Sequence, residues 1–416
     1  MDNELEIDVL GFWWILDNID KKWPGRLTFS KSEGGVLEVF QDEKHEELQW
    51  DRTFHVIKGE ANGGMFTLYK PIHFNSIKNN NQSYYKFKTD TIVLGGYYVN
   101  GEDDFKFSEL GVKLSSIDEW FRGLIAYKVN NFIGKDMPES ITIEYFNESI
   151  IFSIDNLLEG SISTLSNLHQ SLSTFSTSKQ IWFNVTSKDK SLIHYSYLMK
   201  KINYLRVFFS LFLGGVRVFE QLRVENSDKK LEKQVSKLYI KNSFGKPSNG
   251  YTLFEFEEFR ERLSEFIEKW YRLCEEMPEV VNLFYRTYTA NPIYDYHFRE
   301  CYIALEGLYQ WKFKQDTKGN IISPLVQPFI HIPEFKKIIG EYKKWWEVAK
   351  NNRHYQMHLN KNRYGNNILS TPELVKLMRK IESIILCHIL RELGFSDDEI
   401  NQVFFKVSNR FITNYF

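Results

Sequence analysis

Hydrophobic and polar residues alternate in short runs through the first half of the chain. The runs at 27–29 and 36–40 flank Gly34-Gly35, which is typical of a β-hairpin. Such regularly spaced short strands predict an antiparallel sheet of sandwich or barrel-like form. The further β-rich runs, broken by Gly, Asn and Asp, lie at 65–74, 91–99, 105–114 and 141–154.

The pattern is less regular after residue 160. The segment 161–178 is rich in Ser and Thr, and its apolar residues keep a roughly helical spacing. This composition predicts a packed or surface-crossing segment and not a linker. An apolar-periodic stretch at 192–213 predicts a helix that ends at Gly214-Gly215. Two strand-like runs follow, at 216–224 and 235–241.

A helical period begins after the stretch 242–250, whose Ser, Gly, Pro and Asn residues predict a domain boundary. Apolar stripes run from Phe256 to Leu273 and from Phe298 to Tyr309. A loop rich in Gly and Pro then leads to a predicted helix that starts at about residue 334 and carries Arg353. Two more helices are predicted to start at Thr371-Pro372 and at the capping box 396–399.

These patterns predict an α+β protein with two domains. Residues 1–245 would form the β-rich sandwich or barrel-like domain, which includes the helix near 192–213. Residues 251–416 would form an all-α bundle, because short connections favour antiparallel neighbouring helices.

Composition narrows the classes of function. Hydrophobic residues at 43% and aromatic residues at 16% exclude a disordered chain. Among the aromatics, Trp13 and Trp14 are placed either to plug the sheet or to stack on a ligand. A net charge of -1 excludes a broadly basic nucleic-acid coat, so a polyanion would need a local patch. Residues 341–364 supply one, with six basic and two acidic side chains.

The expected compartment follows from three features. The three cysteines lie far apart in apolar helical patterns, which is typical of reduced core residues. The start of the chain is acidic and lacks the apolar run of a signal peptide. The most apolar segment, 205–216, is too short to span a bilayer and contains Arg206. We therefore expect a cytoplasmic protein without a membrane partner.

The candidate chemistry lies in the segment from Arg353 to His358. Arginine stays charged and forks onto phosphate oxygens, whereas histidine carries a proton near neutral pH. RNA cleavage by its own 2′-hydroxyl needs both abilities and no metal or other cofactor. With 16 Arg and 10 His in the chain, an Arg and a His separated by four, five or six residues should occur about once by chance. A solvated basic helix that carries Arg and His therefore remains an open alternative.

Two rival arrangements bear on this segment. His354 and His358 would share a helix face, but a zinc-protease motif needs Glu where Tyr355 stands, so no metal site is expected. On a regular helix Arg353 and His358 are about 140° apart around the axis. Their cooperation therefore needs a helix end near Tyr355 or a second chain.

The chain resembles a known family at both ends. Arg353-His354-Tyr355-Gln356-Met357-His358 is similar to the HEPN ribonuclease motif, and Phe298 to Leu308 is similar to a HEPN helix that ends in an Ala-Leu-Glu-x-Leu pattern. The segments 11–14 and 24–40 are similar to the start of the ApeA N-terminal domain. Together they resemble an ApeA-like phage-defence protein with a HEPN domain.

This resemblance implies a metal-independent endoribonuclease of abortive infection, whose helical domains pair as at least a dimer. Arg353 would stabilise the phosphate, His358 would act as general base or acid, and His354 would occupy the motif's polar position. Glu306 matches the family's helix acid and would support Arg353 or the helix packing. The basic residues expected to bind RNA, with tRNA as one candidate, are Lys350, Lys361 and Arg363.

The resemblance also implies a partner for the first domain. The β-rich part would sense a phage-derived trigger or restrain the nuclease. The alternative function is a non-catalytic HEPN module that binds RNA or protein. Arg353 and His358 decide between the two, since only the nuclease needs both side chains for chemistry.

Overall fold

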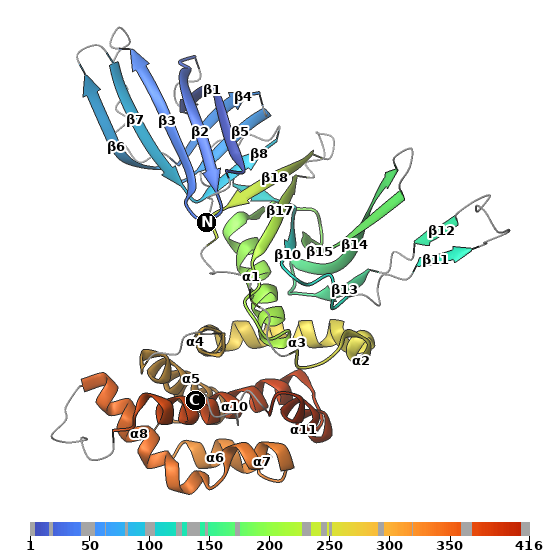
Figure 1. The fold of residues 1–416 in the computed structure, drawn as a ribbon, viewed down its shortest axis with the longest axis vertical. Helices are drawn as coiled ribbons and strands as arrows, with labels where there is room; N and C mark the ends of the chain where they lie inside the picture. The colour runs from blue at the N-terminus through green and yellow to red at the C-terminus, as the bar shows by residue number, and fades with distance from the viewer. Residues whose placement is uncertain are drawn as a thin grey trace. The chain divides into compact units, whose positions relative to one another are not determined.

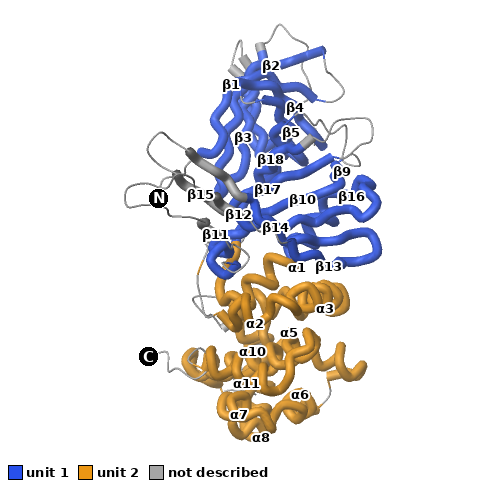
Figure 2. Tube along the Cα trace, turned by 90° about the vertical axis from the view of Figure 1, so that its right-hand side faces the viewer, with its two compact units in different colours: residues 1–203, 218–246 blue, residues 204–217, 247–416 orange. Residues whose placement is uncertain are grey.

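The computed structural model consists of two compact units, which we describe separately (Figure 2). One unit comprises residues 1–203 with 218–246, and the other comprises 204–217 with 247–416. No described helix is long and apolar enough to cross a membrane. The structure describes residues 5–15, 20–42, 55–62, 64–79, 82–95, 105–121, 127–130, 142–145, 149–170, 175–226, 234–242, 248, 252–289, 295–317, 319–358 and 368–408.

The first unit is built on a 14-stranded sheet in which all described neighbours are antiparallel (Figure 1). In sheet order its strands are β13 (Ile150–Ser153), β14 (Leu158–Gln170), β15 (Phe175–Ser187), β10 (Glu109–Leu114), β17 (Phe219–Asn226), β18 (Gln234–Ile240), β8 (Thr91–Leu94), β5 (Gly64–Tyr69), β4 (Val56–Ala61), β1 (Ile7–Ile15), β2 (Trp23–Ser30), β3 (Gly34–Asp42), β7 (Gln82–Thr89) and β6 (Ile72–Asn79). Two small sheets pair β11 (Tyr127–Asn130) with β12 (Thr142–Tyr145), and β16 (Ile193–His194) with β9 (Lys106–Phe107). The expected antiparallel β-rich region is confirmed.

The predicted hairpin at Gly34-Gly35 joins β2 and β3. Ser30 pairs with Gly34, whose φ of 81° lies in the left-handed region that glycine adopts without a steric penalty. The hairpin is therefore observed, with its turn at residues 31–33 and Gly34-Gly35 as the first residues of β3.

The first tryptophan of the Trp13-Trp14 pair fills the core of the sheet. Trp13 is fully buried and Trp14 is 7% exposed, which fits the plug and not the stacking platform. Trp13 pairs with Gly59 across the β1–β4 ladder. A Cβ at Gly59 would lie 2.0 Å from the Trp13 ring, so glycine makes room for the indole.

The roughly helical spacing within 161–178 was misleading. The described residues of this segment, 161–170 and 175–178, belong to the antiparallel strands β14 and β15, in which Ile162 pairs with Phe183 and both side chains are fully buried. Ile162 and Gly160 are two positions apart in β14, so they lie on the same face of the strand. The many Ser and Thr residues of the segment are compatible with strands in which successive side chains point to opposite faces.

The predicted helix at 192–213 is observed as α1 (Tyr195–Phe212), and Gly214 follows it with a φ of 62°. Residues 204–217 belong to the helical unit, whereas the predicted division near 245–251 places them with the β-rich domain. The chain thus passes between the units three times, inside α1, at 217–218 and at 246–247, and the last passage lies within the stretch 242–250.

The second unit is helical, so the predicted α+β class is confirmed. Its helices are α2 (Phe256–Phe259), α3 (Leu263–Glu276), α4 (Pro278–Tyr288), α5 (Asp295–Phe313), α6 (Ile322–Val326), α7 (Pro333–Ile339), α8 (Tyr342–His358), α10 (Thr371–Leu393) and α11 (Asp397–Lys406), with short 3₁₀ turns at Arg260–Arg262 and Gln327–Phe329. The single helix expected from residue 334 is two helices, because Gly340 with a φ of 61° ends α7. A short helix, α6, lies in the expected loop.

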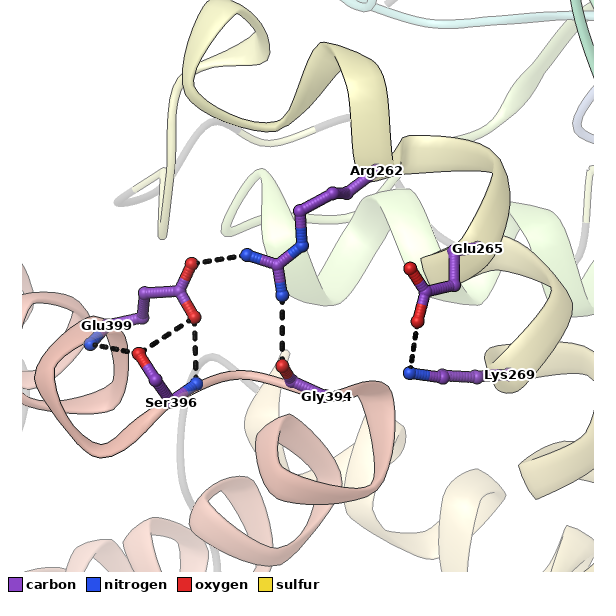
Figure 3. Close-up of polar contacts among 6 residues, drawn as sticks. All are labelled: Arg262, Glu265, Lys269, Gly394, Ser396 and Glu399. Atoms are coloured by element: carbon purple, nitrogen blue, oxygen red, sulfur yellow. Dashed lines mark hydrogen bonds and ion pairs between the residues drawn. The ribbon is translucent and has the colours of Figure 1, made fainter.

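The beginning and the end of the helical unit are joined by polar contacts (Figure 3). Arg262 donates to a Glu399 carboxylate oxygen at 2.5 Å and to the Gly394 carbonyl oxygen at 2.9 Å. Glu399 also completes the capping box with Ser396 at the start of α11. One arginine, in the turn directly before α3, thereby contacts both the residue that follows α10 and the first turn of α11.

Candidate active site

The helix α8 carries the Arg353 to His358 segment within one continuous element. It runs from Tyr342 to His358, so it does not end near Tyr355. The backbone positions of Arg353 and His358 are therefore about 140° apart around the axis. The side chain of His358 and the whole of Lys361 and Arg363 lie outside the described residues. Within one chain, the helix itself does not bring the two motif positions onto one face.

The Arg353 side chain is held by Glu306 on α5. Its Nη2 donates to Glu306 Oε2 at 3.0 Å, and each side chain is 21% exposed. Arg353 Nε is buried and has no hydrogen-bond partner among the residues that the structure describes. The guanidinium is thus anchored at one nitrogen by a carboxylate, while the planar group keeps further donor capacity.

Tyr302 lies one turn before Glu306 on α5 and belongs to the same electrostatic cluster. Burial raises the pKa of the Tyr302 phenol, the charge of Glu306 raises it further, and that of Arg353 lowers it. Tyr302 is only 3% exposed and therefore stays protonated at neutral pH. The sequence pattern identified it as a core aromatic but not as a neighbour of the site.

Asn352 fixes the backbone beside Arg353. It is 1% exposed, its amide donates to the Val348 carbonyl at 2.9 Å, and its carbonyl accepts from the Leu369 N–H at 2.9 Å. The side chain therefore links α8 to the residues that lead into α10. Sequence reasoning did not select Asn352, although a polar residue seven positions after the buried Trp345 falls on the apolar face of the helix.

The remaining candidates also lie on α8. Lys350 is partly exposed, and its Nζ is 5.8 Å from the centroid of a Trp346 ring. His354 is partly buried, one turn after Lys350. Within the part of the chain that the structure describes, no group of three or more His, Cys, Asp or Glu side chains is arranged to hold a metal ion. The described part of the site is thus a positively charged face of α8, on which Arg353 forms an ion pair with Glu306 of α5.

Two family matches cover this architecture. ApeA N-terminal domain 1 matches residues 8–270, which include the described 14-stranded sheet apart from Ile7, the first residue of β1. Apea-like HEPN matches residues 305–399, which include Glu306, Asn352 and all of α8. The chain belongs to the ApeA-like family. Comparison with curated proteins and with solved structures found no match.

Membership gives the site its context. An ApeA-like chain with a HEPN domain is an anti-phage defence protein of the HEPN nuclease type, and HEPN domains are generally ribonucleases. Arg353 and Glu306 come from two different helices of the matched HEPN region. The ion pair between them is therefore a feature of the nuclease-type domain and not of the sheet.

Proposed function

We propose that this ApeA-like chain is a metal-independent endoribonuclease that cuts cellular RNA, with tRNA as one candidate, in abortive infection. The observation that carries the proposal is Arg353 on the basic helix α8, held by Glu306 inside the matched HEPN region. This pair presents a fixed cation where a phosphate could bind.

The reaction uses the 2′-hydroxyl of the RNA as nucleophile. That oxygen attacks the adjacent phosphorus, the bond to the 5′-oxygen breaks, and the products carry a 2′,3′-cyclic phosphate and a 5′-hydroxyl. Arg353 stabilises the negative charge that builds on the non-bridging oxygens. His358 transfers one of the two protons, and His354 is the candidate for the other or for orienting the phosphate. Lys350, Lys361 and Arg363 would hold neighbouring phosphates.

A second copy of the chain completes the site in this proposal. On one α8 the Arg353 and His358 positions diverge by about 140°. Two helical units related by a two-fold axis can place the arginine of one copy beside the histidine of the other. The N-terminal unit would sense a phage-derived trigger, and the enzyme would act in the cytoplasm.

The decisive experiment combines product chemistry with a modified substrate. RNA ends are sequenced, with detection of 2′,3′-cyclic phosphate, after induction of the wild type and of His358→Ala. A matched oligonucleotide carries a 2′-deoxy sugar at the cut site. We expect cyclic phosphate ends from the wild type alone and no cutting of the deoxy substrate, since the nucleophile is missing. Equal cutting of both substrates would overturn the mechanism.

The divergence on α8 favours one competing function, a non-catalytic HEPN module that binds RNA or protein. Phage protection separates the two. Folded Arg353→Ala and His358→Ala variants lose protection if the site is catalytic. If both variants protect as well as the parent, the binding module is the correct function.

A further inference from the structure

A partly exposed tryptophan shares the helix face of Arg353. Trp346 lies seven residues earlier on α8, which places it about 20° from Arg353 around the axis and roughly 10 Å away along it. The preceding Trp345 serves the core instead, since it is 9% exposed and its Nε1 donates to the Ile339 carbonyl at 3.0 Å. The two adjacent tryptophans thus have different surroundings, and only Trp346 reaches the surface on the Arg353 side.

Cations accompany Trp346 along this face. Lys350 lies one turn further along, between Trp346 and Arg353, with Nζ 5.8 Å from the ring centroid. Lys343 is exposed one turn before Trp346. Among the described residues, no other aromatic ring or charged group contacts Trp346. The face therefore offers positive charges at regular intervals and one partly exposed aromatic ring.

This combination fits single-stranded nucleic acid. Lysine and arginine side chains neutralise the phosphates, and an aromatic plane stacks on a base of any identity. With the chain's net charge at -1, the attraction must come from this local cluster.

We propose that Trp346, with Lys350, forms a base-stacking subsite for the nucleotide adjacent to the phosphate that Arg353 binds. This inference rests on the proposed ribonuclease and specifies how its substrate is held. Trp346 would select for unpaired bases, since a base inside a duplex has no free face to offer. The single-stranded loops of folded RNAs would then be the preferred cutting sites.

The test separates binding from cleavage. The probe is a fluorescent single-stranded oligonucleotide of 2′-O-methyl nucleotides, which lacks the attacking hydroxyl and stays intact. Its dissociation constant is measured by anisotropy for the wild type, Trp346→Ala and Trp346→Phe. Replacing the indole by alanine should raise the dissociation constant about 5- to 100-fold, whereas phenylalanine keeps most of the affinity. Probes that each lack one base should identify the base that stacks on Trp346. With the wild type, loss of that base should weaken binding as much as Trp346→Ala does. Trp346→Ala protein should bind this probe as well as it binds the complete one.

The chain offers a matched control in Trp311. It is also a partly exposed tryptophan with a lysine over it, Lys314 at 5.7 Å, but it lies on α5 about 140° from Glu306. Trp311→Ala should bind the probe like the wild type.

Unchanged affinity in Trp346→Ala would overturn the subsite, and a changed oligomeric state with unchanged affinity would assign Trp346 to a contact between copies. Cleavage of an all-ribose version of the probe is measured in a separate assay. A protein that binds the probe through Trp346 but does not cleave the all-ribose version would contradict the ribonuclease and not the subsite.

Discussion

Arg353 on α8 and Glu306 on α5 form an ion pair whose Nη2 to Oε2 distance is 3.0 Å. Each side chain retains about a fifth of its exposure, so water screens part of the attraction. The pair also lies beside the protonated phenol of Tyr302, which cannot compete as an anion. Its main effect is therefore on the orientation of the guanidinium and less on the stability of the fold.

Glu306→Gln should lower RNA cleavage far more than it lowers stability. The amide keeps the size of the side chain but loses the charge, so the free energy of unfolding should fall by about 1 kcal/mol or less. The cleavage rate should fall about tenfold because the guanidinium is no longer fixed. Denaturant unfolding and single-turnover cleavage measure the two effects, with the exposed Glu347→Gln on α8 as control. A stability loss above about 3 kcal/mol with unchanged cleavage would give Glu306 a purely structural role.

Mixing Arg353→Ala with His358→Ala protein should restore cleavage. Each variant alone lacks one motif side chain in every copy. Because α8 is continuous and the two positions diverge, a mixed dimer can combine the intact arginine of one copy with the intact histidine of the other. With free exchange, about half of the dimers are mixed. Cleavage is measured before and after mixing, and a mixture that stays inactive despite proven exchange argues against a shared site.

Asn352→Ala should destabilise the helical unit by about 1 to 3 kcal/mol, because the partly buried Leu369 N–H loses its acceptor, the side chain of the buried Asn352. Denaturant unfolding followed by far-UV circular dichroism measures the change. Gln356→Ala is the control, one turn later on the same helix and partly exposed. Equal stability of the two variants would show that the Asn352 bond adds nothing to the fold.

The contrast between two predicted segments shows what the sequence could establish. The hairpin at Gly34-Gly35 was predicted correctly because a turn and its flanking strands are local features. The segment 161–178 was predicted only as packed or surface-crossing, because its sparse apolar residues fit a helical period, whereas the β14–β15 ladder that contains its described residues depends on residues up to Ser187. Pairing with a distant strand overrides local periodicity.

The candidate site shows the same limit. Arg353 and Glu306 were singled out through local motifs, and they meet in the structure. Asn352 and Tyr302 were missed as site residues, since their roles depend on Leu369 and on the packing of α5 against α8. The break of the helix at Gly340 is visible in the sequence only as a single glycine, and glycine also occurs within helices, as Gly307 does in α5.

Gly59→Ala should destabilise the β-rich unit strongly. The new Cβ would overlap the fully buried ring of Trp13, so the indole or the strand must move, at a cost of about 1 to 3 kcal/mol or more. Gly59 does not have a positive φ, so the expected loss is steric and not conformational. Near-UV circular dichroism and denaturant unfolding report it. A double variant with Trp13→Phe should recover part of the loss, and an absence of any loss in Gly59→Ala would contradict the close packing.

The ion pair of Asp155 and Lys201 should make the β-rich unit sensitive to acid. Lys201 is 2% exposed, and its Nζ lies 2.9 Å from Asp155 Oδ2, which also accepts from the Tyr197 hydroxyl at 2.8 Å. Burial raises the pKa of the Asp155 carboxyl, but the donors Lys201, the Leu157 N–H and Tyr197 outweigh it, so that the pKa is lowered from 3.8. A carboxyl with a lowered pKa in the folded state stabilises the fold above its unfolded pKa. That contribution is lost as the pH falls through the folded value.

Asp155→Asn should therefore cost about 3 kcal/mol at pH 7, where it leaves the buried Lys201 without its carboxylate. The difference from the wild type should shrink as the pH falls below 3.8, the ordinary pKa of this carboxyl, because the wild-type carboxyl then also becomes neutral. Denaturant unfolding from pH 7 to pH 3 measures both curves. Asp8→Asn is the control, since its pair with Arg26 is exposed on both sides and its removal should change stability much less. A difference between Asp155→Asn and the wild type that stays constant across this pH range would show that the charge of Asp155 is not what stabilises the unit.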